Sequence, residues 1–239
     1  MNNYNNPYPY GVGGTDSAAL SAHVSVIMRG VYLKMFFALL VTALTSCGML
    51  LLAPGFTEAL ASNNIFFWGL LIGEIVLVMA ISGGINRFSV TTSSLLFYLY
   101  AIVNGLVFSV ILGAYSPVSV IKTFIVCSAT FGAMSVYGYT TRRDLTRLGS
   151  ILTMALIGLI ICLVVNMFWY NKMLDVIISF VGVIIFVGLT AWDTQQIKRI
   201  AEANPGATDG RLATIGALTL YLDFINLFLY LLRFLGNRD

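Results

Sequence analysis

The stretch LATIGALTLYLDFINLFLYLLRFL, residues 212–235, is long and apolar enough to cross a membrane, yet it carries an aspartate near its middle. A helix needs about 20 apolar residues to span the hydrocarbon core of a bilayer. A carboxylate near the centre of such a helix costs roughly 2.5–3.5 kcal/mol on insertion scales. Asp223 is therefore expected to serve the function of the protein and not only its fold.

The polar residues of this stretch recur at steps of three and four, so they share one face of a helix. They are Gly216, Thr219, Asp223, Asn226, Tyr230 and Arg233. The other faces are mostly leucine. The pattern predicts a helix surrounded by apolar neighbours, with a partner or a wet cavity along the polar face. Thr219, Asn226 and Tyr230 are candidate pore-lining or supporting residues beside Asp223.

The whole chain has the composition of a membrane protein. Of its 239 residues, 59% are hydrophobic and only 10% are charged, against about 25% charged in soluble domains. Continuous apolar runs of this length exclude a β-barrel, whose strands are shorter and alternate in polarity. The expected fold is an all-α membrane protein with seven transmembrane helices, at about 31–53, 65–85, 95–115, 118–139, 150–170, 174–194 and 212–235.

The first 22 residues differ from the rest of the chain. They are rich in Asn, Tyr, Pro and Gly, without the basic start and apolar core of a cleaved signal. Residues 1–22 are predicted to be a polar, disordered tail, and residues 23–239 the seven-helix transmembrane domain. The three cysteines are widely spaced, which excludes a CxxC metal or redox motif. No basic cluster with interleaved aromatics predicts a nucleic-acid partner, and no cofactor is expected.

Lys and Arg are unevenly distributed over the predicted loops. With a cytoplasmic N-terminus, nine of them fall on the inner side: Arg29, Lys34, Arg87, Arg142, Arg143, Arg147, Lys198, Arg199 and Arg211. Four fall on the outer side: Lys122, Lys172, Arg233 and Arg238. Because cytoplasmic loops carry an excess of these residues, this bias predicts a cytoplasmic N-terminus and an external C-terminus.

A second aspartate lies close to the first in this topology. Asp193 ends the sixth predicted helix and Asp223 follows on the antiparallel seventh, so the two carboxylates can approach each other. In a low dielectric they cannot both ionise freely, and they should titrate as a unit. Such a pair supports a proton sensor, an oxygen-rich site for a hard cation such as Ca²⁺, or an acid–base pair for peptide hydrolysis.

Two further ionisable residues lie within or next to the apolar segments. Arg87, at the inner end of the second predicted helix, is placed to pair with Asp193 and lock the cytoplasmic end. Glu74 lies near mid-depth and follows Gly69 and Gly73, a small-residue pair typical of helix packing. It is a possible pore residue or a partner for a neighbouring helix.

Three stretches resemble the motifs of the Bax inhibitor-1 family, also called the transmembrane Bax inhibitor motif proteins, and most closely its bacterial branch. They are SVYGYTTRRDLTRLGSIL (135–152), GLTAWDTQQIKRI (188–200) and LYLDFINLFLYLLRFLG (220–236). The resemblance extends over about residues 25–236. It implies seven helices with the last one central, wrapped by the other six, in a bacterial cytoplasmic (inner) membrane.

The resemblance also implies a function. Members of the family are described as pH-sensitive Ca²⁺ leak channels with a di-aspartyl sensor, which by motif is Asp193 and Asp223. An arginine that ends the second helix, matched in place by Arg87, is thought to latch onto the aspartate of the sixth helix. Some bacterial relatives are associated with a membrane-bound ATP-dependent protease.

The expected function is therefore a pH-sensitive cation (Ca²⁺) leak channel and not an enzyme. Its partners would be the lipid bilayer, Ca²⁺ and protons, with Asp193 and Asp223 as the ligands for Ca²⁺. The first alternative is a membrane regulatory protein that acts on a protease or a stress response without physiological flux. An intramembrane aspartyl protease is the second, although neither aspartate lies in a GxGD sequence and Leu-Tyr-Leu precedes Asp223.

Overall fold

The structure, a computed structural model, describes residues 12–84, 88–204 and 210–237. Within these ranges the chain forms helices and no strands. They are α1 (Val12–Leu52), α2 (Pro54–Ser62), α3 (Asn64–Gly84), α4 (Val90–Leu112), α5 (Pro117–Thr140), α6 (Thr146–Phe168), α7 (Lys172–Ala203) and α8 (Gly210–Leu235). Seven of them, all except α2, are long and apolar enough to cross a membrane. The all-α membrane fold predicted from the sequence is confirmed.

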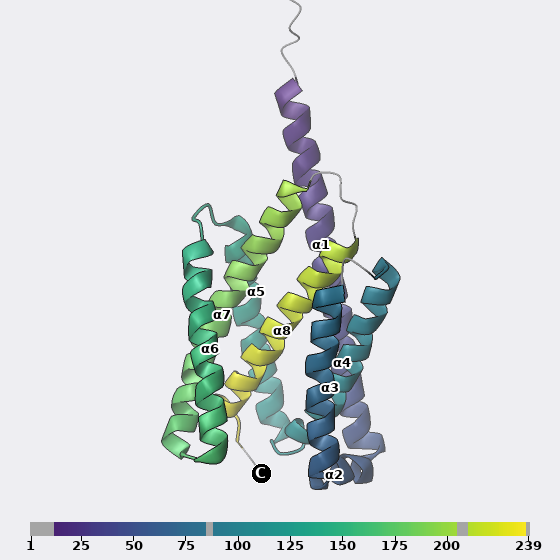
Figure 1. Cartoon of the computed structure of the whole chain (residues 1–239), viewed down its shortest axis with the longest axis vertical. Coiled ribbons are helices and arrows are strands. Elements are labelled where there is room, and N and C mark those ends of the chain that lie inside the picture. Colours follow the sequence, from purple (N-terminus) through teal and green to yellow (C-terminus); the bar gives the residue numbers. More distant parts are fainter. Residues whose placement is uncertain (1–11, 85–87, 205–209, 238–239) are drawn as a thin grey trace, which may run out of the picture.

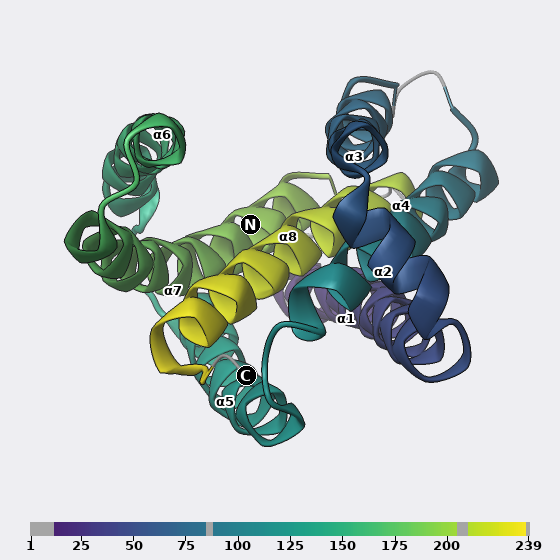
Figure 2. The same cartoon turned by 90° about the horizontal axis from the view of Figure 1, so that it is seen from below.

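Helix α8 runs obliquely through the middle of the bundle (Figures 1 and 2). It packs against α7, α1, α5 and α4, while α3 packs on α4 and α6 packs on α7. Side chains from all around α8 are buried, among them Leu220, Tyr221 and Leu227, which are fully buried. Its polar face, which carries Asp223, would be costly against lipid, so the helix is favoured inside the bundle. This explains why the last segment, as predicted, is the central one.

Helix α1 begins much earlier than the sequence predicts. Residues 12–22, which were assigned to a disordered tail, are helical, whereas residues 1–11 lie outside the described residues. Leu20 and Val24 pack against the core, and a small pocket lined by both also includes Tyr139, Lys198 and Glu202. Helix formation here depends on packing against α5 and α7, because polar residues interrupt the apolar run.

Two other boundaries differ from the sequence prediction. Helix α7 continues to Ala203 instead of ending near residue 194, and its last turns lie beside the part of α1 around Leu20 and Val24, while the first turns of α1 project further (Figure 1). The turn expected at Pro54 is instead the start of α2, with proline at a position it favours in a first helical turn. Leu60 and Thr57 are buried in this short helix.

Two glycines allow α5 and α6 to pack closely against α7 within the motif of residues 188–200. A Cβ added to Gly138 of α5 would overlap the carbonyl group of Ala191 in α7, and one added to Gly149 of α6 would overlap the ring of Trp192. Absence of these side chains lets α5 and α6 pack directly on the turn that precedes Asp193.

Candidate functional site: an aspartate pair between α7 and α8

The two predicted site aspartates meet across the interface of α7 and α8. Their carboxyl groups form a side-chain hydrogen bond. Asp223 is only 4% exposed, and its Oδ2 atom has no hydrogen-bond partner among the described residues. A hydrogen bond between two carboxyl groups forms only when at least one of them carries a proton.

Hydroxyl groups hold the turn of α7 that carries Asp193. Thr194 Oγ1 donates to the carbonyl of Thr190 and lies 3.2 Å from Ser135 Oγ of α5. Ser135 Oγ in turn lies 2.6 Å from Tyr32 Oη of α1. These contacts fix the rotation of α7 relative to α1 and α5. Among the described residues, no cation forms an ion pair with either aspartate.

Arg87 lies outside the described residues, between α3 and α4. The latch between Arg87 and Asp193 therefore stays a prediction of the sequence.

Glu74 joins a separate polar network and not the aspartate pair. Its Oε1 atom accepts a hydrogen bond of 2.9 Å from Asn104 Nδ2 of α4. Asn104 Oδ1 accepts one of 3.1 Å from the Tyr221 hydroxyl of α8, which lies 2.7 Å from Thr42 Oγ1 of α1. Because Tyr221 and Asp223 are two residues apart on a helix, they point to nearly opposite sides of α8. The sequence indicated Glu74 as a candidate residue, but it did not indicate that Tyr221 belongs to the same hydrogen-bond network.

The polar face of α8 lies beside a cleft towards the end of the bundle where α8 ends. This cleft has a volume of about 530 Å³ and includes Asn226, Tyr230 and Arg233 in its lining. These three residues and Thr219 are partly exposed, whereas Gly216 is buried against α1 and α7. Asn226 Nδ2 donates to the Leu222 carbonyl of its own helix. The predicted face therefore splits into a buried part and a part open to the cleft.

At the end of this face, Arg233 pairs with an acid that sequence reasoning missed. Its Nη2 atom lies 2.9 Å from Asp175 Oδ1 in the first turn of α7. Asn166 Nδ2 of α6 donates to the same oxygen at 3.3 Å, and Asn166 Oδ1 accepts from the backbone N–H of Asn171. The signal in the sequence was an acid three residues after Lys172, in a first helical turn.

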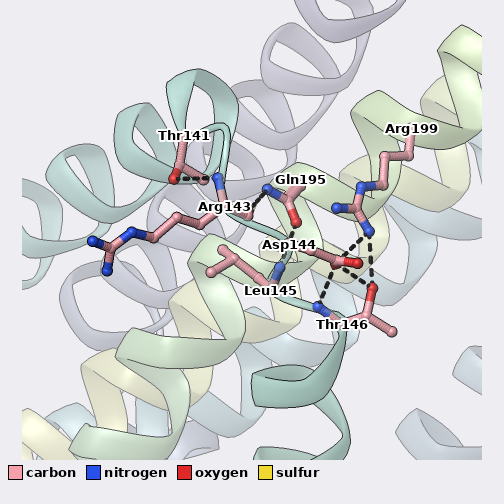
Figure 3. A network of polar contacts seen from close by, with 7 residues as sticks. All are labelled: Thr141, Arg143, Asp144, Leu145, Thr146, Gln195 and Arg199. Atoms are coloured by element: carbon pink, nitrogen blue, oxygen red, sulfur yellow. Dashed lines mark hydrogen bonds and ion pairs between the residues drawn. The ribbon is translucent and has the colours of Figure 1, made fainter.

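A second polar cluster fastens the loop between α5 and α6 to α7 (Figure 3). Gln195 Oε1 accepts from the backbone N–H of Leu145 at 2.9 Å, and its Nε2 atom donates to the Arg143 carbonyl at 2.8 Å. Arg199 Nη1 lies 2.8 Å from Asp144 Oδ1. The side chain of Arg143 points away from this cluster (Figure 3). The motifs of residues 135–152 and 188–200 thus meet at this loop. Gln195, which joins them, is two residues from Asp193.

Asp144 is held in its charged form in this loop. Its carboxylate accepts hydrogen bonds from the hydroxyl and the backbone N–H of Thr146 and lies beside Arg199, and these contacts lower its pKa from 3.8 to about 2. A carboxylate with a lowered folded pKa contributes stability above its unfolded pKa, and the contribution is lost as the pH falls through the folded value. The fastening of the loop is therefore expected to persist in mild acid.

Hydrogen–deuterium exchange tests this expectation. After correction for the intrinsic pH dependence, the amides of residues 144–148 should exchange equally at about pH 7 and about pH 5, and faster only below about pH 4. Asp144→Asn should exchange faster at both higher values, because it loses the charge that Arg199 and Thr146 hold. A loop that loosens between pH 7 and pH 5 in the unmodified protein would contradict the assignment.

The pair of aspartates suits transient rather than tight cation binding. Among the described residues, no group of three or more His, Cys, Asp or Glu side chains is placed to hold a metal ion. Ca²⁺ takes about six to eight oxygen ligands. Two carboxyl groups supply only some of them, so water or backbone oxygens would have to complete the shell.

Comparison with known proteins agrees with this arrangement of motifs. The family described as inhibitor of apoptosis-promoting Bax1 matches residues 24–239. Inner membrane protein YbhL of Escherichia coli strain K12 is 45% identical over 184 residues, which are 76% of this chain and 79% of YbhL. An uncharacterized protein of Borreliella burgdorferi is 47% identical over 179 residues, 74% of this chain and 77% of that protein. None of these descriptions names an enzymatic activity. This chain is a membrane protein that belongs to the Bax inhibitor-1 family.

Proposed function

We propose that the protein is a pH-sensitive cation (Ca²⁺) leak channel in the cytoplasmic membrane of a bacterium, in which Asp193 and Asp223 form the site where protons and cations compete. The observation that carries the proposal is the hydrogen-bonded pair itself, with Asp223 buried between α7 and α8. An acid at this depth in an apolar helix is costly to the fold, which favours a functional role.

The chemistry of the pair follows from charge. With one shared proton, the two carboxyl groups satisfy each other by a hydrogen bond. When both ionise, two negative charges face each other in a medium of low dielectric, and a divalent cation between them relieves the repulsion. The unpartnered Oδ2 atom of Asp223 is a free ligand for that cation.

Arg87 is the proposed latch at the cytoplasmic end. Paired with ionised Asp193, it would hold that end closed, because a lone charge at this depth is costly. Protonation of the aspartate pair removes the partner of Arg87 and favours opening. The proposed leak therefore rises as the pH falls.

The proposed orientation has the N-terminus and the α5–α6 loop in the cytoplasm and the C-terminus outside. Supporting it, the loop between α5 and α6 lies at the end of the bundle where α1 begins (Figure 1). Arg142 and Arg143 of this loop and Arg147 in the first turn of α6 are exposed, and Arg199 of α7 pairs with Asp144 of the same loop. An excess of Lys and Arg marks the cytoplasmic side of membrane proteins. The inner membrane is named for the similar YbhL and is proposed here for this chain.

Asp223→Asn tests the channel directly. Asparagine neither ionises nor shares a proton in the same way, so the coupled titration of the pair is lost. In liposomes loaded with a Ca²⁺-sensitive dye, the unmodified protein should leak more as the pH is lowered, and the variant should lose this dependence on pH. Glu58→Gln, which neutralises an exposed carboxylate of α2, is the matched control and should behave like the unmodified protein. Identical leak curves for Asp223→Asn and the unmodified protein would overturn the proposal.

Catalysis is not part of the proposal. An aspartyl protease needs both carboxyl groups open to water and to an extended peptide, whereas Asp223 is 4% exposed. Regulation of a membrane-bound ATP-dependent protease remains the alternative from the family resemblance. It predicts that the protein acts through a partner even when Asp223→Asn has no effect on leak.

A further inference from the structure

The interface between α7 and α8 continues from the aspartate pair towards the end where α8 ends. Seven residues from each aspartate, which is about two helical turns, Phe186 of α7 and Tyr230 of α8 meet. Their rings are stacked, with centroids 5.7 Å apart and planes 23° apart. Phe186 is buried, whereas Tyr230 is partly exposed.

Gly182 allows the ring of Tyr230 to lie against the backbone of α7. A Cβ added to Gly182 would lie 2.6 Å from Cδ1 of Tyr230, well inside van der Waals contact. The aromatic ring thus fills the space between the two helices from the Phe186 ring to the α7 backbone. No gap wide enough for a hydrated ion remains where these groups are in contact.

The same tyrosine also borders the cleft of about 530 Å³ described above. The cleft lies between α4, α6 and α8 and includes Ile111, Leu163 and Asn226 in its lining. Asn226 is one helical turn, about 4.5 Å of rise, from Asp223. Tyr230 therefore has the cleft on one side and the interface that holds the aspartate pair on the other.

The charges at the mouth of the cleft do not oppose a cation. Arg233 lines the cleft but is paired with Asp175 at 2.9 Å, so the mouth carries a neutral ion pair instead of a bare positive charge. Asn226 and Tyr230 add neutral polar groups along α8. The cleft has room for several water molecules, and these three side chains supply polar partners for them in an otherwise mostly apolar lining.

We propose that this cleft is the vestibule through which water and cations approach Asp223 from the end where α8 ends, and that the stacked Tyr230 and Phe186 rings are the gate that closes it. This proposal rests on the proposed leak function. The stacked ring faces offer a cation none of the oxygen ligands that replace its hydration shell, and apolar constrictions close pores by excluding water. Removing the Tyr230 ring opens the way from the vestibule to the pair.

Thiol labelling tests the gate without any measurement of flux. In a protein with Cys47, Cys127 and Cys162 replaced by alanine, Asp223→Cys supplies a single thiol behind the gate. A charged, membrane-impermeant methanethiosulfonate reagent is added to reconstituted protein on each side separately. From the side where α8 ends, labelling should be slow with Tyr230 present and at least about tenfold faster in Tyr230→Ala, the factor given by a barrier lower by about 1.4 kcal/mol.

Phe234→Ala is the matched control. Phe234 packs against Phe180 of the same pair of helices, with ring centroids 6.2 Å and planes 48° apart, but it is exposed on the outside of the bundle. Its removal should leave the labelling rate unchanged. Tyr230→Leu, which removes the ring while keeping an apolar side chain, serves if the alanine variant does not fold. It should also label faster, because a branched chain does not stack on Phe186.

The outcomes separate the gate from the channel. Faster labelling in both Tyr230 variants supports the gate, even if no variant conducts Ca²⁺. Equal labelling in the parent and both variants overturns it, as does an equal increase in Phe234→Ala. If the unmodified protein shows a pH-dependent leak that Asp223→Asn removes, while Tyr230→Ala leaves labelling unchanged, the channel stands and the gate is wrong.

Discussion

Gly138→Ala is expected to destabilise the protein by about 3 kcal/mol, the upper end of the usual penalty for overpacking. The added methyl group would overlap the carbonyl group of Ala191 in the neighbouring helix α7. Backbone cannot yield as a flexible side chain does, so α5 and α7 must separate. That separation would also disturb the contact of Thr194 with Ser135 near the aspartate pair.

Unfolding by sodium dodecyl sulfate in mixed micelles measures this loss. Gly132→Ala is the matched control, because Gly132 lies on the same helix and a Cβ there meets no atom within 4 Å. Since alanine favours a helix over glycine by roughly 0.5–1 kcal/mol, this variant should be neutral or slightly more stable. Equal stability of the two variants would show that α5 and α7 are not in the close contact described.

Gln195→Leu is expected to cost on the order of 3 kcal/mol and to free the loop between α5 and α6. The amide of Gln195, 5% exposed, binds one backbone N–H and one backbone carbonyl of this loop. Leucine has a similar size but leaves both backbone groups without their partner, and each unsatisfied buried group costs about 1–3 kcal/mol. Because Gln195 follows Asp193 by two residues, the rotation of α7 at the aspartate pair should also loosen.

Limited trypsin digestion reports on the loop, since cleavage follows Arg142 and Arg143. The Gln195→Leu variant should be cut there faster than the unmodified protein. Gln196→Leu makes the same chemical change one residue later, at a partly exposed position. It should leave the cleavage rate unchanged. If both variants are cut alike, Gln195 does not hold the loop.

The prediction that Asp193 and Asp223 lie together rests on a signal that does not extend to their surroundings. A carboxylate inside an apolar run is visible in the sequence because it is costly in a membrane. Its partner is visible only when it too is charged and lies on the next helix, as with Asp193 and Asp223. Asp175 and Gln195 stand near helix ends or beside other polar residues, and the sequence does not indicate which side chains they contact.

The boundaries of α1 and α7 were mispredicted for a related physical reason. The hydropathy of a segment reports where it leaves the hydrocarbon, and both helices continue beyond that point. Their extensions lie beside each other, with Leu20 and Val24 packed on the core and His23 Nε2 3.1 Å from the Asn204 carbonyl. Such contacts join residues far apart in the chain, so no local pattern reveals them.

The sequence by itself determined the class of the protein and the number of its membrane spans, because a bilayer requires about 20 apolar residues and internal hydrogen bonding of the backbone in each span. It also indicated Asp223 and Asp193 as candidate site residues. Only the tertiary structure decided which side chains meet: Glu74 with Asn104, Arg233 with Asp175, and Tyr230 with Phe186. Those pairings depend on the rotation and tilt of each helix, which the packing of the whole bundle sets.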